Sequence, residues 1–210
     1  MFSNKDLRKL IIPLVIEQLL AVTIGMADTV MVSSCGEAAV SGISLVDSIN
    51  FLLITLFSSL ATGGAVIASQ YIGRGDHKSA SLAAKQLFYA SLALSAVLGV
   101  IAVFFRKPVL NMVFGSIEAD VMAHAQIYFL LSAISYPFLA VYNAGAALFR
   151  SMGDSRTTML ISILMNTINI VGNAILIYGF QMAAAGAATA SLVSRAVGAI
   201  IITVLLLNPR

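Results

Sequence analysis

Six long apolar segments constrain what this chain can fold into. They cover approximately residues 10–33, 42–68, 82–105, 121–148, 158–178 and 186–207. A helix of ~20 mostly apolar residues crosses the ~30 Å hydrocarbon core of a bilayer, and each segment reaches that length. Only 10% of the 210 residues are charged, whereas soluble domains carry about 25%. The sequence therefore predicts an all-α integral membrane protein, with one six-span lobe over residues 1–210.

Charge placement and motifs argue against several function classes. The basic residues do not form a stripe interleaved with aromatics, which argues against a nucleic-acid partner. A single cysteine, Cys35, excludes an intrachain disulfide and gives no metal-ligand spacing. The loops contain neither a phosphate-binding motif nor a Ser/His/Asp set. We therefore expect no enzyme activity, no nucleic-acid binding and no cofactor other than a coupling ion.

Lysine and arginine near the span ends predict the orientation in the membrane. Cytoplasmic loops carry an excess of these residues. If the N-terminus is cytoplasmic, the opposite side receives only Arg106 and Lys107. The cytoplasmic side then receives Lys5, Arg8, Lys9, Arg74, Lys78, Lys85, Arg150, Arg156 and Arg210. This asymmetry predicts a multi-pass protein of the cell membrane with both termini in the cytoplasm.

Four charged residues lie inside the predicted spans: Glu17, Asp28, Asp47 and Arg195. An ionisable group at the bilayer centre costs from ~2.5 to more than ~10 kcal/mol, so it usually has a partner or lines a pathway. Asp28 is neither at a span end nor long enough to reach the membrane surface, whereas Asp47 is one turn inside its span and within reach of headgroup water. Glu17 fits either a pathway or a structural hydrogen bond to a neighbouring helix. Arg195 requires water or one of the three carboxylates, and the sequence does not select among them.

The fifth span carries a polar stripe. Ser162, Asn166, Asn169 and Asn173 are four, three and four residues apart, so they share one face of an α-helix. In lipid that face must point into the bundle. Interhelical hydrogen bonding alone, at ~0.6 kcal/mol per contact, accounts for one asparagine better than for three.

The depths of four polar residues predict that they meet in one layer. At 1.5 Å per residue, Asp28 lies about 27 Å from the inner end of its span. Asn173 and Asn169 lie about 22 Å and 16 Å from the inner end of theirs, and Ser191 lies about 7 Å below the outer end of the sixth. Their oxygens would form a cage for a small hard cation such as Na⁺, by analogy with oxygen-ligated Ca²⁺ and Mg²⁺ sites. Alternatively, Asp28 takes up and releases a proton.

Several stretches in the same order resemble the multidrug and toxic compound extrusion (MATE) family of the MOP superfamily. They are PLVIEQLLAVTIGMADTVMVSSCGEAAVSGISLVDSI, QYIGRGDHKSA, FLAVYNAGAALFRSMGDSRTTM, NTINIVGNAILIYG and GAATAS. The resemblance runs from about Pro13 to Ser191. Each motif is degenerate when taken singly, and the ordered set is fairly specific.

The resemblance implies a secondary antiporter that exports organic, often cationic, drugs in exchange for sodium or protons. Family members typically have twelve spans in two six-helix lobes, with a cleft between them. By this resemblance Asp28 corresponds to the carboxylate of the first helix that takes part in coupling. Asn169 corresponds to an asparagine of the same site, and Ser191 to a threonine or serine of the sixth helix. Asn173 stands where many members have a second aspartate, so any proton coupling at this site would depend on Asp28 alone.

The chain resembles only the N-terminal lobe of the family. The expected partner is therefore a second six-helix lobe, either a missing C-terminal half or a second copy in a parallel homodimer. Two other functions remain open from the sequence. One is a lipid-linked oligosaccharide flippase of the same superfamily, and the other is a half-length membrane module that assembles without transporting.

Overall fold

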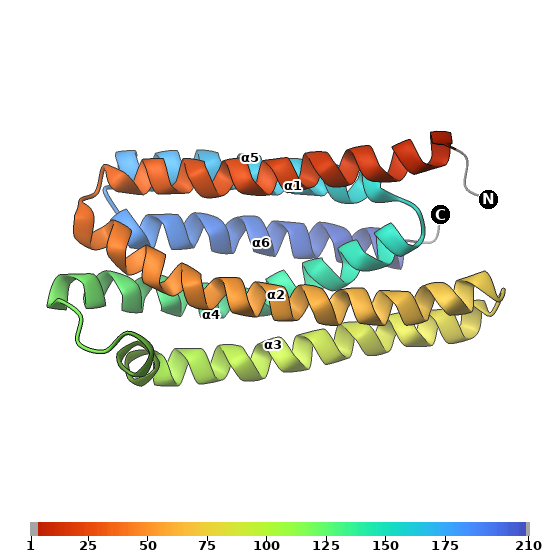
Figure 1. Cartoon of the computed structure of the whole chain (residues 1–210), viewed down its shortest axis with the longest axis horizontal. Coiled ribbons are helices and arrows are strands. Elements are labelled where there is room, and N and C mark those ends of the chain that lie inside the picture. Colours follow the sequence, from red (N-terminus) through yellow and green to blue (C-terminus); the bar gives the residue numbers. More distant parts are fainter. Residues whose placement is uncertain (1–3, 209–210) are drawn as a thin grey trace.

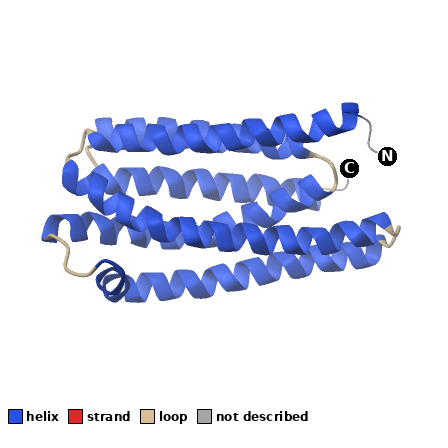
Figure 2. Ribbon diagram, in the orientation of Figure 1, coloured by secondary structure: helices blue, strands red, loops and turns tan. Residues whose placement is uncertain are grey.

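The computed structural model describes residues 4–208, without the side chains of residues 4–7, 9, 21 and 24. Arg210, which entered the prediction of orientation, lies outside the described residues. The described part is an all-helical bundle with no strand (Figures 1 and 2). Its elements are α1 (Asn4–Ser33), α2 (Glu37–Gly73), α3 (His77–Phe114), α4 (Ala119–Ser151), α5 (Ser155–Asn173), the π-helix η1 (Ala174–Gly179) and α6 (Ala183–Leu207). The prediction of six helices long and apolar enough to cross a membrane is confirmed.

The helices extend beyond the predicted apolar spans, most clearly at the turn between α2 and α3. The sequence predicted a break over IGRGDHKS, whereas only Arg74, Gly75 and Asp76 separate the two helices. Gly75 adopts a φ of +74°, which favours glycine. The Asp76 side chain accepts a hydrogen bond from the backbone N–H of Ser79 at 3.0 Å and caps α3. These hydrogen bonds lower the pKa of the exposed Asp76 carboxyl group below its usual value.

The predicted break beginning at Arg106 lies at a kink of α3. The backbone departs from helical geometry at Phe105, with φ −105° and ψ 17°, three residues before Pro108, and the residues after the kink are helical up to Phe114 rather than a loop. Proline lacks the N–H that would bond the preceding turn, so it bends a helix without necessarily ending it. Leu110 is buried in the main core, which holds the segment after the kink against the bundle. Figure 1 shows this last part of α3 nearly end-on.

Helix α4 is the centre of the lobe and packs against α2, α3 and α6. Its buried face is rich in small residues, including Ala133, Ala140 and Ala144. Small side chains permit the close helix approach on which packing in lipid depends. Figure 1 shows that α4 bends about midway along its length, and Pro137 stands at the middle of its sequence. A proline inside a helix removes one backbone hydrogen bond and bends the helix, so Pro137 accounts for the bend.

Helix α1 lies at the edge of the lobe and packs mainly on α5. The sequence predicted one regular helix over 158–178, whereas the structure changes from α-helix to π-helix directly after Asn173. In the π-helix, the backbone N–H of Phe180 bonds the carbonyl of Ile175, five residues earlier, at 3.1 Å. Such π-helical turns are frequent at functional sites.

The two ends of the bundle differ in charge. Figure 1 places the start of α1, the end of α6, the α2–α3 turn and the α4–α5 turn at one end. Arg74 lies in the first of these turns, and Lys78, Arg150 and Arg156 lie in the helix ends next to them. Arg106 and Lys107 follow the kink of α3 at the other end. Most of the basic residues in the described part of the chain therefore lie at one end of the bundle.

Candidate cation-binding site

Four polar residues from three helices form one hydrogen-bonded chain. The side-chain amide of Asn173 donates to Oδ1 of Asp28, which joins α5 to α1. The same amide donates to Oδ1 of Asn169 at 3.3 Å. The amide of Asn169 in turn donates to the hydroxyl of Ser191 on α6 at 3.0 Å. The structure thus brings together the four residues that the depth calculation placed in one layer.

The oxygen of the Asn173 side chain has no hydrogen-bond partner. Asn173 is fully buried, and its Oδ1 is one of four buried polar side-chain atoms without a partner among the described residues. An unsatisfied buried acceptor costs about 1–3 kcal/mol. A bound cation would remove that cost, because it would accept electron density from this oxygen and from the carboxylate of Asp28.

The ligand atoms available at this site are oxygens. Asp28 is the only carboxylate in the chain of hydrogen bonds, and the other atoms are amide and hydroxyl oxygens. Oxygen ligands of this kind could hold a small hard cation.

Arg195 does not form an ion pair with any of the carboxylates that the sequence proposed for it. Its Nη1 donates to the hydroxyl of Ser135 on α4 at 2.6 Å. The ion pair that the described part of the chain contains joins Arg150 to Glu17 and does not involve Arg195. Asp28 instead accepts a hydrogen bond from the amide of Asn173 through its Oδ1.

A second polar cluster joins α2 to α4. Oδ1 of Asp47 accepts from the hydroxyl of Tyr128 at 3.0 Å and from the amide of Asn50 at 3.3 Å. The amide of Asn50 also donates to Ser132 at 3.3 Å, and its carbonyl accepts from the hydroxyl of Tyr136 at 2.8 Å. Asp47 is therefore held by α4, although its side chain stays exposed on this lobe.

The sequence analysis named Asp47 but missed the other residues of this second cluster. A signal for them was present, because Tyr128, Ser132 and Tyr136 recur every four residues and share one helix face. Asn50 stands one turn after Asp47 on α2. The spacing rule that predicted a polar stripe in the fifth span would also have predicted one in the fourth span.

Glu17 and Asn166 lie outside the chain of hydrogen bonds at Asp28. Glu17 forms an ion pair with Arg150, Oε1 to Nη1 at 3.2 Å, and accepts from the hydroxyl of Thr158 at 3.3 Å. Asn166 is half-buried, and its amide lies 3.5 Å from the hydroxyl of Ser162 on its own helix. The contacts of Glu17 hold neighbouring helices together, and the contact of Asn166 stays within its own helix.

Comparison with known proteins places this geometry in a family. The MatE family model matches residues 13–175. A probable multidrug resistance protein NorM from Thermotoga maritima is 31% identical over 209 residues, which cover 95% of this chain and 44% of that relative. The uncharacterized transporter YisQ from Bacillus subtilis is 29% identical, over 94% of this chain and 44% of its own length. The chain therefore spans less than half the length of these relatives.

Solved structures show the same fold. An outward-facing MATE family transporter of the MOP superfamily superposes with a TM-score of 0.90 at 24% identity, over 97% of this chain and 45% of its own. A MOP superfamily transporter from Pyrococcus furiosus superposes with a TM-score of 0.84 at 27% identity, over 97% and 44%. The six helices thus match one lobe of these larger proteins. The MatE family model matches most of this chain. The chain therefore belongs to the MatE family, whose members are membrane transporters and not enzymes.

Proposed function

We propose that this chain forms one lobe of a secondary antiporter that exports organic cations in exchange for Na⁺ or protons. The observation that carries the proposal is the chain of hydrogen bonds from Asp28 through Asn173 and Asn169 to Ser191. It sets one carboxylate against neutral oxygens inside helices long enough to span a membrane. The names of several relatives, multidrug resistance protein NorM and multidrug export protein MepA, support the choice of substrate.

Coupling would arise from differential binding. A ligand shifts a conformational equilibrium only by the difference between its affinities for the two states. Asp28 lies on α1, which packs mainly on α5, and Asn169 and Asn173 lie on α5. A cation bound between them would favour close packing of α1 on α5. An organic cation would favour the alternative packing, in which the carboxylate of Asp28 is released from Asn173.

Two coupling ions are compatible with the site. Na⁺ would bind Asp28 together with the unpaired oxygen of Asn173 and the oxygens of Asn169 and Ser191. A proton would bind the Asp28 carboxylate alone, because Asn173 does not titrate. In either case the loaded site is neutral, which lowers the cost of its burial in the lobe.

Transport also needs a partner and an orientation. Because the relatives are more than twice as long, we propose a second six-helix lobe as partner, supplied by a longer chain or by a second copy. The basic end of the bundle would face the cytoplasm, with both termini on that side. The drug pathway would then run between the two lobes.

Gradient-driven uptake of an organic cation, tetraphenylphosphonium, into proteoliposomes tests the proposal. The complete gene product is reconstituted, and a Na⁺ gradient or a pH gradient is imposed separately. We expect one gradient to drive uptake, and Asp28→Asn to abolish that uptake while the protein still inserts. Asp120→Asn, which removes an exposed carboxylate in the first turn of α4, is the matched control and should transport normally.

Three outcomes would overturn the proposal. Gradient-driven uptake at the wild-type rate in the Asp28→Asn protein would remove Asp28 from coupling. Uptake in neither gradient, by a correctly inserted wild-type protein, would favour the non-transporting membrane module. Movement of a lipid-linked oligosaccharide in the same vesicles would instead favour the flippase.

A further inference from the structure

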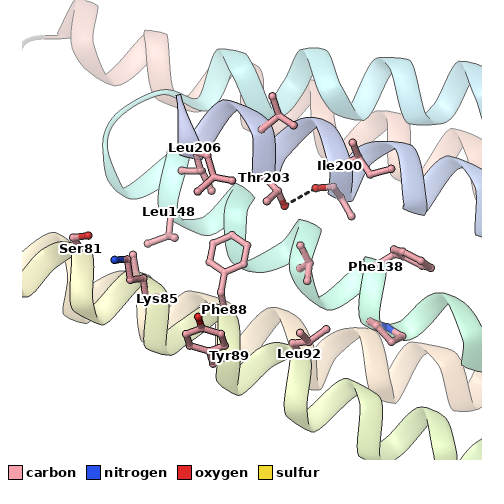
Figure 3. Close-up of a pocket in the computed structure, with 16 residues that line it drawn as sticks. Ser81, Lys85, Phe88, Tyr89, Leu92, Phe138, Leu148, Ile200, Thr203 and Leu206 are labelled. Atoms are coloured by element: carbon pink, nitrogen blue, oxygen red, sulfur yellow. Dashed lines mark hydrogen bonds between the residues drawn. The ribbon is translucent and has the colours of Figure 1, made fainter. Parts of the chain in front are cut away.

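An apolar groove runs between α3 and α6 on the side of the lobe away from the cation site. Its floor is α4, and its volume is ≈ 870 Å³, within the ~300–1,000 Å³ of small-molecule sites. Figure 3 shows Phe88, Thr203 and Ile200 directed into it from the two walls. None of the four residues in the chain of hydrogen bonds at Asp28 lines this groove.

The bend in α4 contributes to the shape of the groove. Pro137 and Phe138 line its deeper part, and Leu148 lines the floor nearer its basic end. Along α3 the lining extends from Ser81 to Leu92, which is about 16 Å at 1.5 Å per residue. One leaflet of a ~30 Å hydrocarbon core is about 15 Å deep. The groove therefore has the length of one leaflet.

The groove is polar at one end. Figure 3 shows Ser81 and Lys85 at that end, with Leu92 and Phe138 toward the other. The hydroxyl of Thr203, midway along, donates to the carbonyl of Ala199 at 2.7 Å and is already satisfied. Lys85 is exposed and takes part in no ion pair recorded within residues 4–208. Among the residues that line the groove, Lys85 is the one with a charged side chain.

We propose that this groove binds an anionic phospholipid of the leaflet at the basic end of the lobe. An acyl chain would lie against the apolar walls, and the headgroup phosphate would bind Lys85. Basic pockets between transmembrane helices are typical sites for anionic headgroups. Arg74 and Lys78 lie at the same end of the bundle, but neither lines the groove. An organic cation is disfavoured as the occupant, because Lys85 would repel it. This proposal does not depend on antiport.

Fluorescence quenching by brominated lipids can test the proposal, because the chain contains no tryptophan. Phe138→Trp places a reporter in the groove, and Val97→Trp places one on an exposed position of α3 that does not line it. The intact chain is placed in phosphatidylcholine nanodiscs that contain either brominated phosphatidylglycerol or brominated phosphatidylcholine. We expect the groove reporter to favour phosphatidylglycerol about five-fold, the effect of one lysine near an anionic lipid. The Val97 reporter should show no preference.

Charge variants identify the residue that gives the preference. Lys85→Gln should abolish it at the groove reporter, and Lys85→Arg should retain it. Lys78→Gln removes the same charge at the same end without touching the groove, and it should leave the preference unchanged. Equal quenching by the two lipids in the wild-type background would overturn the proposal, as would loss of preference in Lys78→Gln. A groove reporter that neither lipid quenches, beside a quenched Val97 reporter, would overturn it as well, because protein would then cover the groove.

Discussion

Arg150, at the end of α4, donates from Nη1 to Oε1 of Glu17 on α1 across 3.2 Å. Helix α1 otherwise packs mainly on α5, so this ion pair ties α1 to the central helix of the lobe. The hydroxyl of Thr158 on α5 donates to the second oxygen of Glu17 at 3.3 Å. Three helices therefore meet at one carboxylate near the basic end of the bundle.

The contribution of this ion pair is measurable by a double-mutant cycle. Glu17→Gln and Arg150→Met should each lower the free energy of unfolding in detergent. The double variant should lose less than the sum of the two, by about 1 kcal/mol, because the contact is lost only once. The side chains are partly buried, at 18% and 29% exposure, so solvent screens the pair incompletely. Strictly additive losses would show that the two charges act independently.

Removing the amide of Asn173 should weaken binding of the coupling cation. Asn173→Leu has a similar volume but loses the donor to Asp28 and the unpaired oxygen. A hydrogen bond to a charged group is worth about 1.5–3 kcal/mol, so the half-saturating Na⁺ concentration should rise roughly 10-fold or more. Asn166→Leu, on the same helix but outside the chain of hydrogen bonds, is the control. Equal shifts in the two variants would argue against a specific role for Asn173.

The cluster at Asn50 should be sensitive to loss of one hydroxyl. Tyr136→Phe leaves the carbonyl of Asn50 without the donor that now lies 2.8 Å away. An unsatisfied buried acceptor costs about 1–3 kcal/mol, and the free energy of unfolding should fall by that amount. Tyr89→Phe removes a hydroxyl from a side chain that is 72% exposed, and should change stability by less than ~0.5 kcal/mol. Equal stability of the two variants would contradict the role of this hydrogen bond.

A methyl group added at Gly42 should separate α2 from α4. A Cβ there would lie 2.9 Å from the carbonyl oxygen of Val121 and 2.9 Å from the backbone nitrogen of Ala125. Backbone atoms cannot rotate away, so Gly42→Ala should destabilise the lobe by about 1–3 kcal/mol.

Gly63 on the same helix provides the matched control, because a Cβ added there would meet no atom within 4 Å. Gly63→Ala should leave stability unchanged or raise it by up to ~1 kcal/mol, since alanine favours a helix. Thermal unfolding followed by circular dichroism distinguishes the two. A Gly42→Ala protein as stable as Gly63→Ala would show that the helices separate at no cost.

The sequence by itself determined the membrane class, the six helices and the face of α5 that points inward. These depend on local quantities, namely the length of an apolar run and the 3.6-residue period of a helix. The common depth of Asp28, Asn169, Asn173 and Ser191 also followed from local rules, because straight helices of known rise place residues at calculable depths. Their contact required the packing of α1 on α5 and of α5 on α6.

Only the tertiary structure decided which partner each charged side chain takes. Arg195 was free to pair with any of three carboxylates by depth, yet it donates to Ser135, while Glu17 pairs with Arg150. Partner choice depends on how each helix is rotated and tilted against its neighbours, and differences of a few ångströms decide it. The same holds for the kink before Pro108 and for the groove beside Lys85, which arise where packed helices bend or diverge. Periodicity fixes a face of one helix, whereas packing fixes what that face meets.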